Sequence, residues 1–416
     1  MINTLTRSLL MTATFMAPAV FLRISGIHPS PVVSLVAFGA AVVAASFVLA
    51  WAAEAAQMDV SGGLAIAVLA LIAVLPEYAV DLYYAYVAGH NADYVQYAAA
   101  NMTGSNRLLM GVGWPVVVIV GLFVAQKAAA RDGKPRSSSV LPLESGNRVE
   151  LGFLLIAGLV AFIIPATGRI HLVLGVALLA WFGFYLYKMT RGEPEEPDLI
   201  GTAAAIGALP TRARRSTVVA LFIVAGAVIL MCAEPFADSL IGAGTQLGVD
   251  RFLLVQWLAP LASEAPEFII AIIFASRGKS TAAIATLIAS KVNQWTLLVG
   301  SLPIAYTVGG GTGPLVLDGR QIEEMLLTAT QTMMGVALIL ALQFHRNVAW
   351  ALLVLFLVQF PITSTTGRLA LCGVYGVLTV VGLIINRRHV VATLRAPFVD
   401  AEDDEVPERE LSAAGR

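Results

Sequence analysis

Long apolar runs along almost the whole chain restrict its fold more than any other feature. A helix needs roughly 20 residues to cross the hydrocarbon core of a bilayer. Candidate spans lie at about 8–23, 31–56, 62–89, 94–126, 149–166, 168–189, 216–245, 250–277, 280–308, 322–344, 347–363 and 367–386. Spanning segments must satisfy their own backbone hydrogen bonds, and no alternating barrel pattern is present. The sequence therefore predicts an all-α polytopic membrane protein with about ten to twelve transmembrane helices.

Composition excludes several other classes of protein. Hydrophobic residues make up 58% of the chain and charged residues 13%, about half the charged fraction of a soluble domain. The basic residues form short clusters between apolar runs, which does not predict a nucleic-acid partner. Cys232 and Cys372 both lie in apolar stretches, too few for a disulfide framework or a zinc site. We expect lipid and inorganic cations as partners, and no cofactor.

The distribution of Lys and Arg predicts the orientation of the spans. If the amino terminus is cytoplasmic, 19 of the 26 basic residues fall on the cytoplasmic side and 5 on the other, while Arg107 and Lys291 lie inside spans. This bias follows the positive-inside rule. We expect a multi-pass protein of the plasma (cell inner) membrane with both termini in the cytoplasm.

Two acid-bearing spans resemble each other. Residues 75–78 read Leu-Pro-Glu-Tyr and residues 265–268 read Ala-Pro-Glu-Phe, in spans that the predicted topology orients in opposite directions. A helix with a mid-depth serine follows each one, at Ser105 and Ser290. Similar sequences in antiparallel orientation are typical of inverted-repeat transporters.

This repeat predicts a helical bundle of five plus five helices with flanking helices. The expected parts are an extra N-terminal helix (1–30), a first repeat (31–189), a charged cytoplasmic linker (190–215), a second repeat (216–363), an extra C-terminal helix (364–390) and a disordered acidic tail (391–416).

The prolines of the two motifs predict backbone oxygens that are available to an ion. Pro76 has no amide hydrogen to donate to the carbonyl of Ile72, and Pro266 has none for Ala262. A helix broken at mid-depth, beside a carboxylate, offers the hard oxygen ligands that Na⁺ and Ca²⁺ prefer.

Four carboxylates near these prolines are candidate ion ligands. Glu77 and Glu267 directly follow the prolines, and an intramembrane acid is costly enough to indicate a function. Asp81 shares a helix face with Glu77, and Glu264 shares one with Glu267. We expect the four acids to converge, with Glu77 facing Glu267. The alternative is that the prolines are ordinary helix kinks and the acids are paired structural groups. That alternative does not explain why the proline–acid arrangement occurs twice.

Neutral oxygens for the same site come from Ser105, Asn106, Ser290 and Ser263. Each is a candidate ion ligand. The alternative for each is close helix packing or a hydrogen bond to a backbone carbonyl, which is a common use of small polar residues in membrane helices.

These motifs resemble the two α-repeats of the calcium/cation antiporter superfamily, in the membrane region of the sodium/calcium exchangers. The resemblance spans about 31–363 and is carried by 75–77 with 101–106, and by 263–267 with 289–290. It implies ten core helices and calcium export driven by sodium or protons through alternating access. Glu77 and Glu267 match the central acids of the family, and Ser105 and Ser290 match its repeat serines.

The chain also departs from the family pattern. The family's Gly-Thr-Ser triplet is Ile-Ala-Val at 72–74, which removes two hydroxyls, and Ala-Ser-Glu at 262–264. The family's polar residue four positions after the repeat serine is present as Gln294 but is Leu109 in the first half. These departures leave fewer polar ligands for the family's sodium sites in one half.

Arg107 and Lys291 add buried positive charge, and we expect both to compensate nearby acids. One hypothesis is that Lys291 neutralises Glu264 or Glu267 and replaces one transported cation; the alternative is a structural salt bridge.

The leading hypothesis is a secondary antiporter, not an enzyme, that exchanges Ca²⁺ for Na⁺ or protons at a mid-membrane carboxylate site. A sodium/proton antiporter is the alternative within transport. A transport-inactive scaffold would not need four acids, and an intramembrane enzyme would need a nucleophile with its base or a metal centre.

Overall fold

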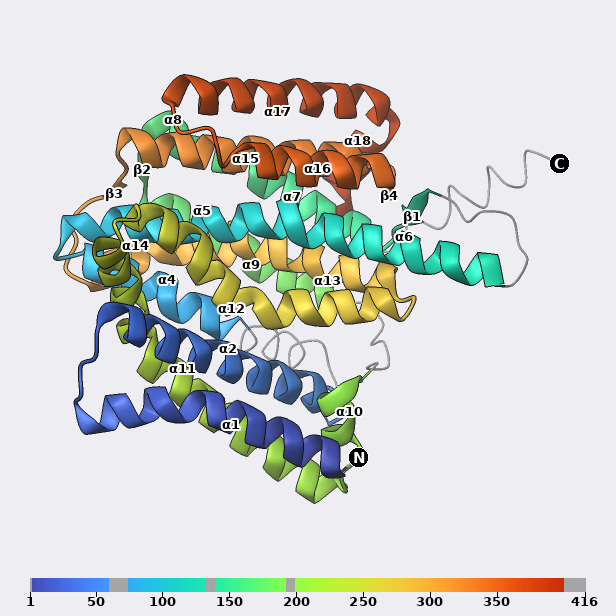
Figure 1. Ribbon diagram of the computed structural model, residues 1–416. Coiled ribbons are helices and arrows are strands. Elements are labelled where there is room, and N and C mark those ends of the chain that lie inside the picture. Colours follow the sequence, from blue (N-terminus) through green and yellow to red (C-terminus); the bar gives the residue numbers. More distant parts are fainter. Residues whose placement is uncertain (1, 60–73, 132–138, 192–198, 400–416) are drawn as a thin grey trace. The chain divides into compact units, whose positions relative to one another are not determined.

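The computed structural model describes residues 2–59, 74–131, 139–191 and 199–399 (Figure 1). Ile72 and the expected tail from residue 400 lie outside them. Within these residues, nine helices are long and apolar enough to cross a membrane, and Arg346–Val358 is a shorter apolar helix. The prediction of an all-α polytopic protein is confirmed.

The helices, in chain order, are α1 Ile2–Ser25, α2 Pro31–Ala56, α4 Leu75–Ala88, α5 Val95–Leu108, α6 Trp114–Arg131, α7 Asn147–Ala161, α8 Ile163–Thr167, α9 Leu172–Met189, α10 Gly201–Gly207, α11 Thr211–Leu247, α12 Arg251–Ser276, α13 Ser280–Asn293, α14 Val299–Val308, α15 Gly319–Ile339, α16 Arg346–Val358, α17 Thr365–Ile385 and α18 Arg387–Arg395. Short 3₁₀ turns, η1 and η4, cover Ala92–Tyr94 and Ala396–Phe398. The strands are β1 Val140–Pro142, β2 Arg169–Ile170, β3 Leu315–Val316 and β4 Gln343–His345.

The chain forms two compact units, each assembled from separate stretches. The first unit contains Met1–Leu108, Ile164–Ile270 and Thr296–Met325, and the second contains Leu109–Ile163, Ala271–Trp295 and Leu326–Arg416.

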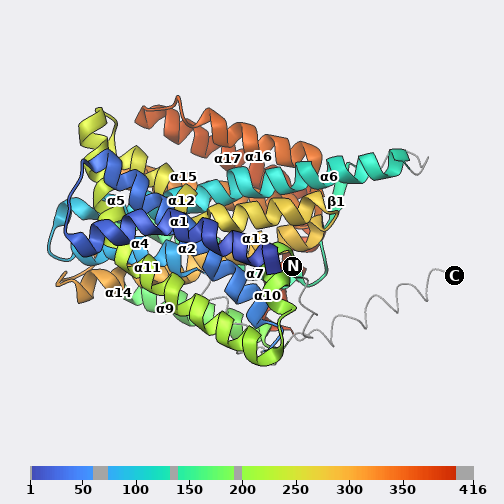
Figure 2. The same cartoon turned by 60° about the horizontal axis from the view of Figure 1, so that its bottom comes forward.

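In the first unit, α2 packs along both α1 and α11, and the three helices lie side by side in Figures 1 and 2. Alanines such as Ala41, Ala45 and Ala52 are completely buried on α2. Small side chains let membrane helices approach closely, which explains an alanine-rich helix here. Helix α4 packs on α5, α11 and α14, and β2 pairs with β3 in antiparallel register.

In the second unit, α13 packs on α6 and α7, and α16 packs on α6. The indole of Trp114 donates to the carbonyl of Leu287 across 3.2 Å. The amide of Asn386, at the end of α17, donates to the carbonyl of Ala337 across 2.9 Å. Strands β1 and β4 pair antiparallel.

Both repeats change to π-helical backbone at the same point. Residues Leu109–Gly113 (η2) follow α5 and residues Gln294–Leu298 (η3) follow α13. Each segment begins four residues after its repeat serine, Ser105 or Ser290. A π-helical turn is rare and occurs mostly at functional sites, so its duplication supports the two-repeat interpretation. The single predicted span at 94–126 is therefore α5, η2 and α6.

The segment expected as a linker is partly helical. It contains α10, and α11 begins at Thr211. With 37 residues, α11 is about 55 Å long at 1.5 Å per residue, well above the roughly 30 Å hydrocarbon thickness. The segment 391–416, expected as a disordered tail, also begins with helix. Helix α18, which is basic and amphipathic, continues to Arg395.

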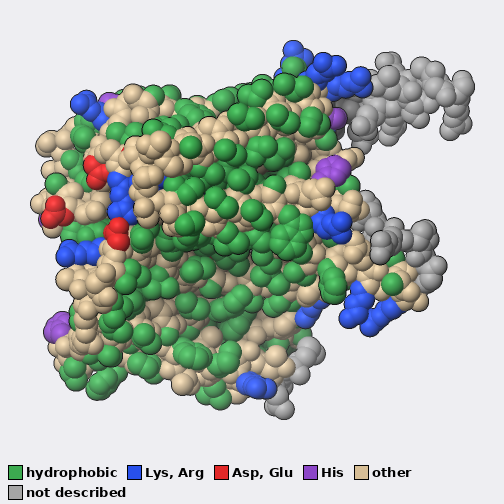
Figure 3. Space-filling model, turned by 45° about the horizontal axis from the view of Figure 1, so that its top comes forward, with side chains coloured by type: hydrophobic (Ala, Val, Ile, Leu, Met, Phe, Trp, Pro, Cys, Tyr) green, Lys and Arg blue, Asp and Glu red, His purple; other side chains and the backbone are tan. Residues whose placement is uncertain are grey.

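The surface agrees with a lipid environment. Figure 3 shows hydrophobic side chains spread across the face that is drawn, among backbone and other uncharged side chains. Large apolar side chains such as Phe21, Leu230 and Ile384 are more than three-fifths exposed. Such exposure suits contact with lipid tails.

Candidate functional site

Glu77 and Ser105 bring the first acid motif and the first repeat serine together. Pro76 lies in the first turn of α4, where its missing amide hydrogen is not needed, and Glu77 follows it. Glu77 is 6% exposed, and Ser105 is completely buried on α5. The Ser105 hydroxyl is 2.7 Å from Glu77 Oε1.

The second half contributes Glu264 to the same hydroxyl. Glu264, on α12, is 3% exposed, and its Oε1 contacts Ser105 Oγ. A hydroxyl carries one hydrogen, so Ser105 can donate to only one of the two carboxyl groups. The second contact is a hydrogen bond only if the other carboxyl group is protonated and donates to Ser105. We call this group of three side chains the carboxyl–serine cluster.

The backbones of α5 and α12 nearly touch beside this cluster. A Cβ atom on Gly104 would lie 1.7 Å from the backbone oxygen of Gln256. Any side chain at Gly104 would separate the helices. This glycine therefore allows a serine of the first half to reach an acid of the second.

The other expected ligands are arranged differently. Glu267, which we expected opposite Glu77, is half-buried, and the acid that shares Ser105 with Glu77 is instead Glu264, one turn earlier on α12. The Ser263 hydroxyl lies 3.1 Å from the carbonyl oxygen of Ala259 and 3.4 Å from that of Pro260, so it donates within its own helix.

Asn106 and Ser290 also donate to carbonyls of their own helices. The bonds run to Met102 at 3.1 Å and to Thr286 at 3.1 Å, respectively. Gln294 is buried at the start of η3. Helix α12 continues through Pro266, which cannot bond the carbonyl of Ala262.

Asp81 and Asn101 form a second buried layer between α4 and α5. Both are completely buried. Their side chains are adjacent. Neither Asp81 oxygen and neither polar atom of the Asn101 amide has a hydrogen-bond partner of good geometry within the described residues.

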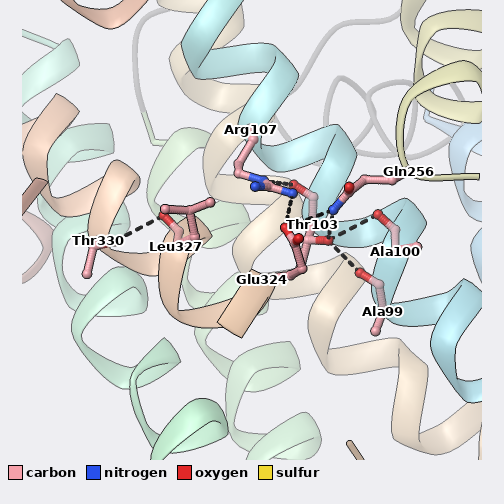
Figure 4. Close-up of polar contacts among 8 residues, drawn as sticks. All are labelled: Ala99, Ala100, Thr103, Arg107, Gln256, Glu324, Leu327 and Thr330. Carbon is pink, nitrogen blue, oxygen red and sulfur yellow. Dashed lines mark hydrogen bonds and ion pairs between the residues drawn. The ribbon is translucent and has the colours of Figure 1, made fainter. Parts of the chain in front are cut away.

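Arg107 is the centre of a third polar cluster, shown in Figure 4. Its guanidinium forms an ion pair with Glu324 of α15, and the two side chains are 2% and 5% exposed. The amide of Gln256 donates to Glu324 Oε2 at 3.1 Å and to Thr103 Oγ1 at 3.2 Å. Arg107 also lies over the Trp257 ring, 5.0 Å from its centroid. This network ties α5 to α12 and α15.

Sequence reasoning did not identify Glu324 or Gln256. Glu324 lies inside the apolar segment 322–344, so the rule that intramembrane acids indicate function would have found it. Gln256 has no comparable signal. Arg107 thus pairs with an acid outside the four expected ones.

Lys291 is fully buried on α13, with its ammonium 5.9 Å from the centroid of the Trp295 ring.

Charged groups also lie at the ends of the first unit's helices. Asp238 accepts hydrogen bonds from Tyr83 and Tyr94, both within 3.1 Å. Asp59 accepts from Arg214 at 2.7 and 2.8 Å and from Arg215 at 3.0 Å. The hydrogen bond from Arg214 lowers the pKa of Asp59 to about 2.

Within the described residues, no group of three or more His, Cys, Asp or Glu side chains is arranged to hold a metal ion.

Comparison with known proteins places the fold and the repeats in one family. A family model described as sodium/calcium exchanger protein matches residues 30–191 and 217–383. The chain is 39% identical to a protein whose crystal structure is described as the H⁺/Ca²⁺ exchanger CAX, with a TM-score of 0.87 over 94% of this chain and 97% of that one. A comparison with curated protein sequences gives no match.

Two more distant structures share the fold alone. The Ca²⁺/H⁺ antiporter protein YfkE is 16% identical, with a TM-score of 0.59 over 89% of this chain and 99% of that chain. A structure of the sodium-calcium exchanger NCX_Mj is 17% identical, with a TM-score of 0.52 over 80% of this chain and 99% of that chain. The resemblance noted in the two acid motifs is confirmed over both repeats. The chain is an integral membrane protein and belongs to the sodium/calcium exchanger protein family.

Proposed function

We propose that this protein is a secondary antiporter that exchanges Ca²⁺ for protons across the membrane. The carboxyl–serine cluster carries the proposal. Glu77 and Glu264 come from opposite halves of the chain, are almost completely buried and share one hydroxyl. Two ionised carboxylates that contact the same hydroxyl repel each other in a medium of low dielectric constant. The pair therefore binds either a proton or a cation.

The charges of this cluster suit an exchange of Ca²⁺ for protons. With both carboxylates ionised, the pair carries the charge that one Ca²⁺ neutralises. Ca²⁺ takes six to eight oxygen ligands at 2.3–2.6 Å, and bidentate carboxylates supply up to four of them. The Ser105 oxygen and the carbonyl of Ala262 are further candidates. Binding of Ca²⁺ then requires that the shared proton leaves.

Protons are favoured over Na⁺ as the coupling ion. Residues 72–74 contain no hydroxyl, and the Ser263 hydroxyl donates within its own helix. The first half therefore has no hydroxyl at these positions for a Na⁺ site, and the one hydroxyl at the matching positions of the second half is already engaged. Similarity to an H⁺/Ca²⁺ exchanger at 39% identity supports the same assignment.

The remaining candidates form an outer set. Glu267 is a carboxylate one turn from Glu264 and can receive the ion as it leaves. Asn106 belongs to this set, because its amide donates to the carbonyl of Met102 in its own helix. Ser290 and Gln294 stay candidate ligands of the second repeat. The orientation with both termini in the cytoplasm of the plasma membrane is part of the proposal. It is tested by labelling introduced cysteines with a membrane-impermeant thiol reagent.

The test is Ca²⁺ flux in proteoliposomes that contain the purified protein. An imposed pH gradient should drive Ca²⁺ uptake, and a Na⁺ gradient at equal pH should not. Glu77→Gln and Glu264→Gln should each abolish uptake. Glu234→Gln is the matched control, because Glu234 is half-exposed and pairs with Arg23. Na⁺-driven Ca²⁺ uptake, or Na⁺/H⁺ exchange without Ca²⁺ movement, would contradict the proposal.

Lys291 is proposed to replace one transported cation. It is a fully buried positive charge next to Ser290 in the second repeat. Replacement of Lys291 by Met would remove that fixed charge and should make transport dependent on Na⁺. Unchanged coupling in the variant would reject this role.

A further inference from the structure

The side chains between α4 and α5 form two layers. Asp81 follows Glu77 by four residues on α4, and Asn101 precedes Ser105 by four residues on α5. Four residues are about one helical turn, so each pair of residues stacks on one helix face. The Ser105 hydroxyl contacts Glu77 in one layer, and Asn101 is adjacent to Asp81 in the next.

The second layer contains four polar atoms without a hydrogen-bond partner in the described chain. These are both oxygens of Asp81 and both polar atoms of the Asn101 amide, on two side chains that are completely buried. A buried polar atom without a partner lowers stability, so this layer requires something to complete it.

A proton on Asp81 completes the layer. A carboxylic acid has one donor and one acceptor, and a primary amide has a matching acceptor and donor. The acid O–H can donate to Asn101 Oδ1 while the amide N–H donates to the other Asp81 oxygen. An ionised Asp81 has no donor and would leave Asn101 Oδ1 without a partner. The two side chains supply only three oxygens, fewer than the six to eight that Ca²⁺ takes.

We propose that Asp81 and Asn101 form a second proton-binding site, separate from the carboxyl–serine cluster, that is occupied in the absence of Ca²⁺ and emptied when Ca²⁺ binds. This inference rests on the proposed Ca²⁺/H⁺ exchange. It adds one proton to the number exchanged for each Ca²⁺.

The surrounding charges explain why Ca²⁺ would displace this proton. Asp81 is completely buried one helical turn from Glu77, whose carboxyl belongs to the cluster. Burial and a neighbouring negative charge both disfavour a second negative charge, so Asp81 holds its proton while the cluster is empty. A doubly charged ion one turn away reverses this field and favours the ionised form.

Among the described residues, α14, α11, α5 and η1 pack on α4 and supply Asp81 with no unpaired positive charge; η1 carries the acid Asp93. Helix α14 contains no acid or base other than Tyr306. On α11, Glu234 pairs with Arg23, and Asp238 accepts from Tyr83 and Tyr94. On α5, Arg107 pairs with Glu324.

Asp81→Asn is the central variant. The new amide can pair reciprocally with Asn101, as the protonated acid does, so we expect a folded protein that cannot release this proton. Calorimetric titration of the detergent-purified full chain with Ca²⁺, in buffers of different ionisation enthalpy, counts the protons released. We expect one fewer proton per Ca²⁺ than in the wild-type protein.

The double variant Asp81→Asn with Asn101→Asp moves the carboxyl group to the other side of the pair and should restore the lost proton. Glu234→Gln should release the wild-type number. An equal proton count in Asp81→Asn and the wild type would overturn the second site. Absence of any proton release from the wild type would instead overturn the proposed Ca²⁺/H⁺ exchange.

Infrared difference spectra of the wild type provide a readout that does not depend on any variant folding. Ca²⁺ binding should remove the carbonyl bands of two protonated carboxyl groups. Loss of only one such band would contradict the second site.

Discussion

The two repeats have the same backbone plan but use their serines differently. In both, a π-helical segment begins four residues after the serine. Ser105 is completely buried and contacts carboxylates from both halves, whereas Ser290 is half-buried and donates to the carbonyl of Thr286 in its own helix. The duplication has kept the helix geometry while the chemistry of the two copies has diverged.

The residues next to the serines diverge in the same way. Gly104 allows α5 to touch α12, and its counterpart before Ser290 is Ala289. Arg107 is held by Glu324, and Lys291 lies over the Trp295 ring. The carboxyl–serine cluster is thus built around the first-half serine, with the second half supplying an acid.

The largest effect on stability should come from Arg107. Replacement of Arg107 by Leu leaves Glu324 buried without its cation, which should cost roughly 3–5 kcal/mol of folding stability. Replacing both residues by Leu should recover much of that loss. Thermal unfolding in detergent measures both, and a single variant as stable as the wild type would contradict a stabilising pair.

The next largest effect is expected at Gly104, whose counterpart in the second repeat is Ala289. Gly104→Ala places a methyl group 1.7 Å from a backbone oxygen, so the helices must separate, at about 1–3 kcal/mol or more. Ca²⁺ affinity should fall with stability. The reciprocal change, Ala289→Gly, should cost only about 1 kcal/mol of helix propensity. Equal losses in both variants would remove the asymmetry between the repeats.

The two serines give a direct test of the same asymmetry. Ser105→Ala removes a hydrogen bond to charged groups, worth roughly 1.5–3 kcal/mol, and should weaken Ca²⁺ binding roughly tenfold to a hundredfold. Ser290→Ala should weaken it at most about threefold. Calcium titrations of both variants decide, and a larger loss at Ser290 would reverse the comparison.

The smallest effect is expected at Asp59, away from the cluster. Its pKa of about 2 lies below the ordinary 3.8, because Arg214 and Arg215 favour the ionised form. The stability that this gives is present above about pH 4 and is lost as the pH falls toward 2. The melting temperature of the wild type should exceed that of Asp59→Asn at neutral pH, and the two should converge near pH 2. A constant difference would contradict the assignment.

The sequence predicted the features that follow from strong patterns. Apolar runs of sufficient length gave the all-α polytopic fold, and the two Pro-Glu motifs gave the family. The π-helical segments could not be anticipated, because one begins with Leu109 and the other with Gln294, and no residue type marks such a turn.

The partner of Glu77 was also beyond the sequence. Glu264 and Glu267 lie one turn apart on α12, so helix periodicity gives both acids the same face. The choice of Glu264 depends on how α12 meets α5 at Gly104, which is a tertiary contact. The pairing of Glu324 with Arg107 was missed for a similar reason, because the two residues are far apart in the chain and meet only in the folded protein.

A structure of the purified protein with bound Ca²⁺, determined at a pH above that at which the cluster loses its proton, tests the central claim most directly. The account predicts one ion within about 2.3–2.6 Å of carboxylate oxygens from both Glu77 and Glu264. An ion held by oxygens of only one repeat, with Glu264 turned away from Ser105, would contradict it.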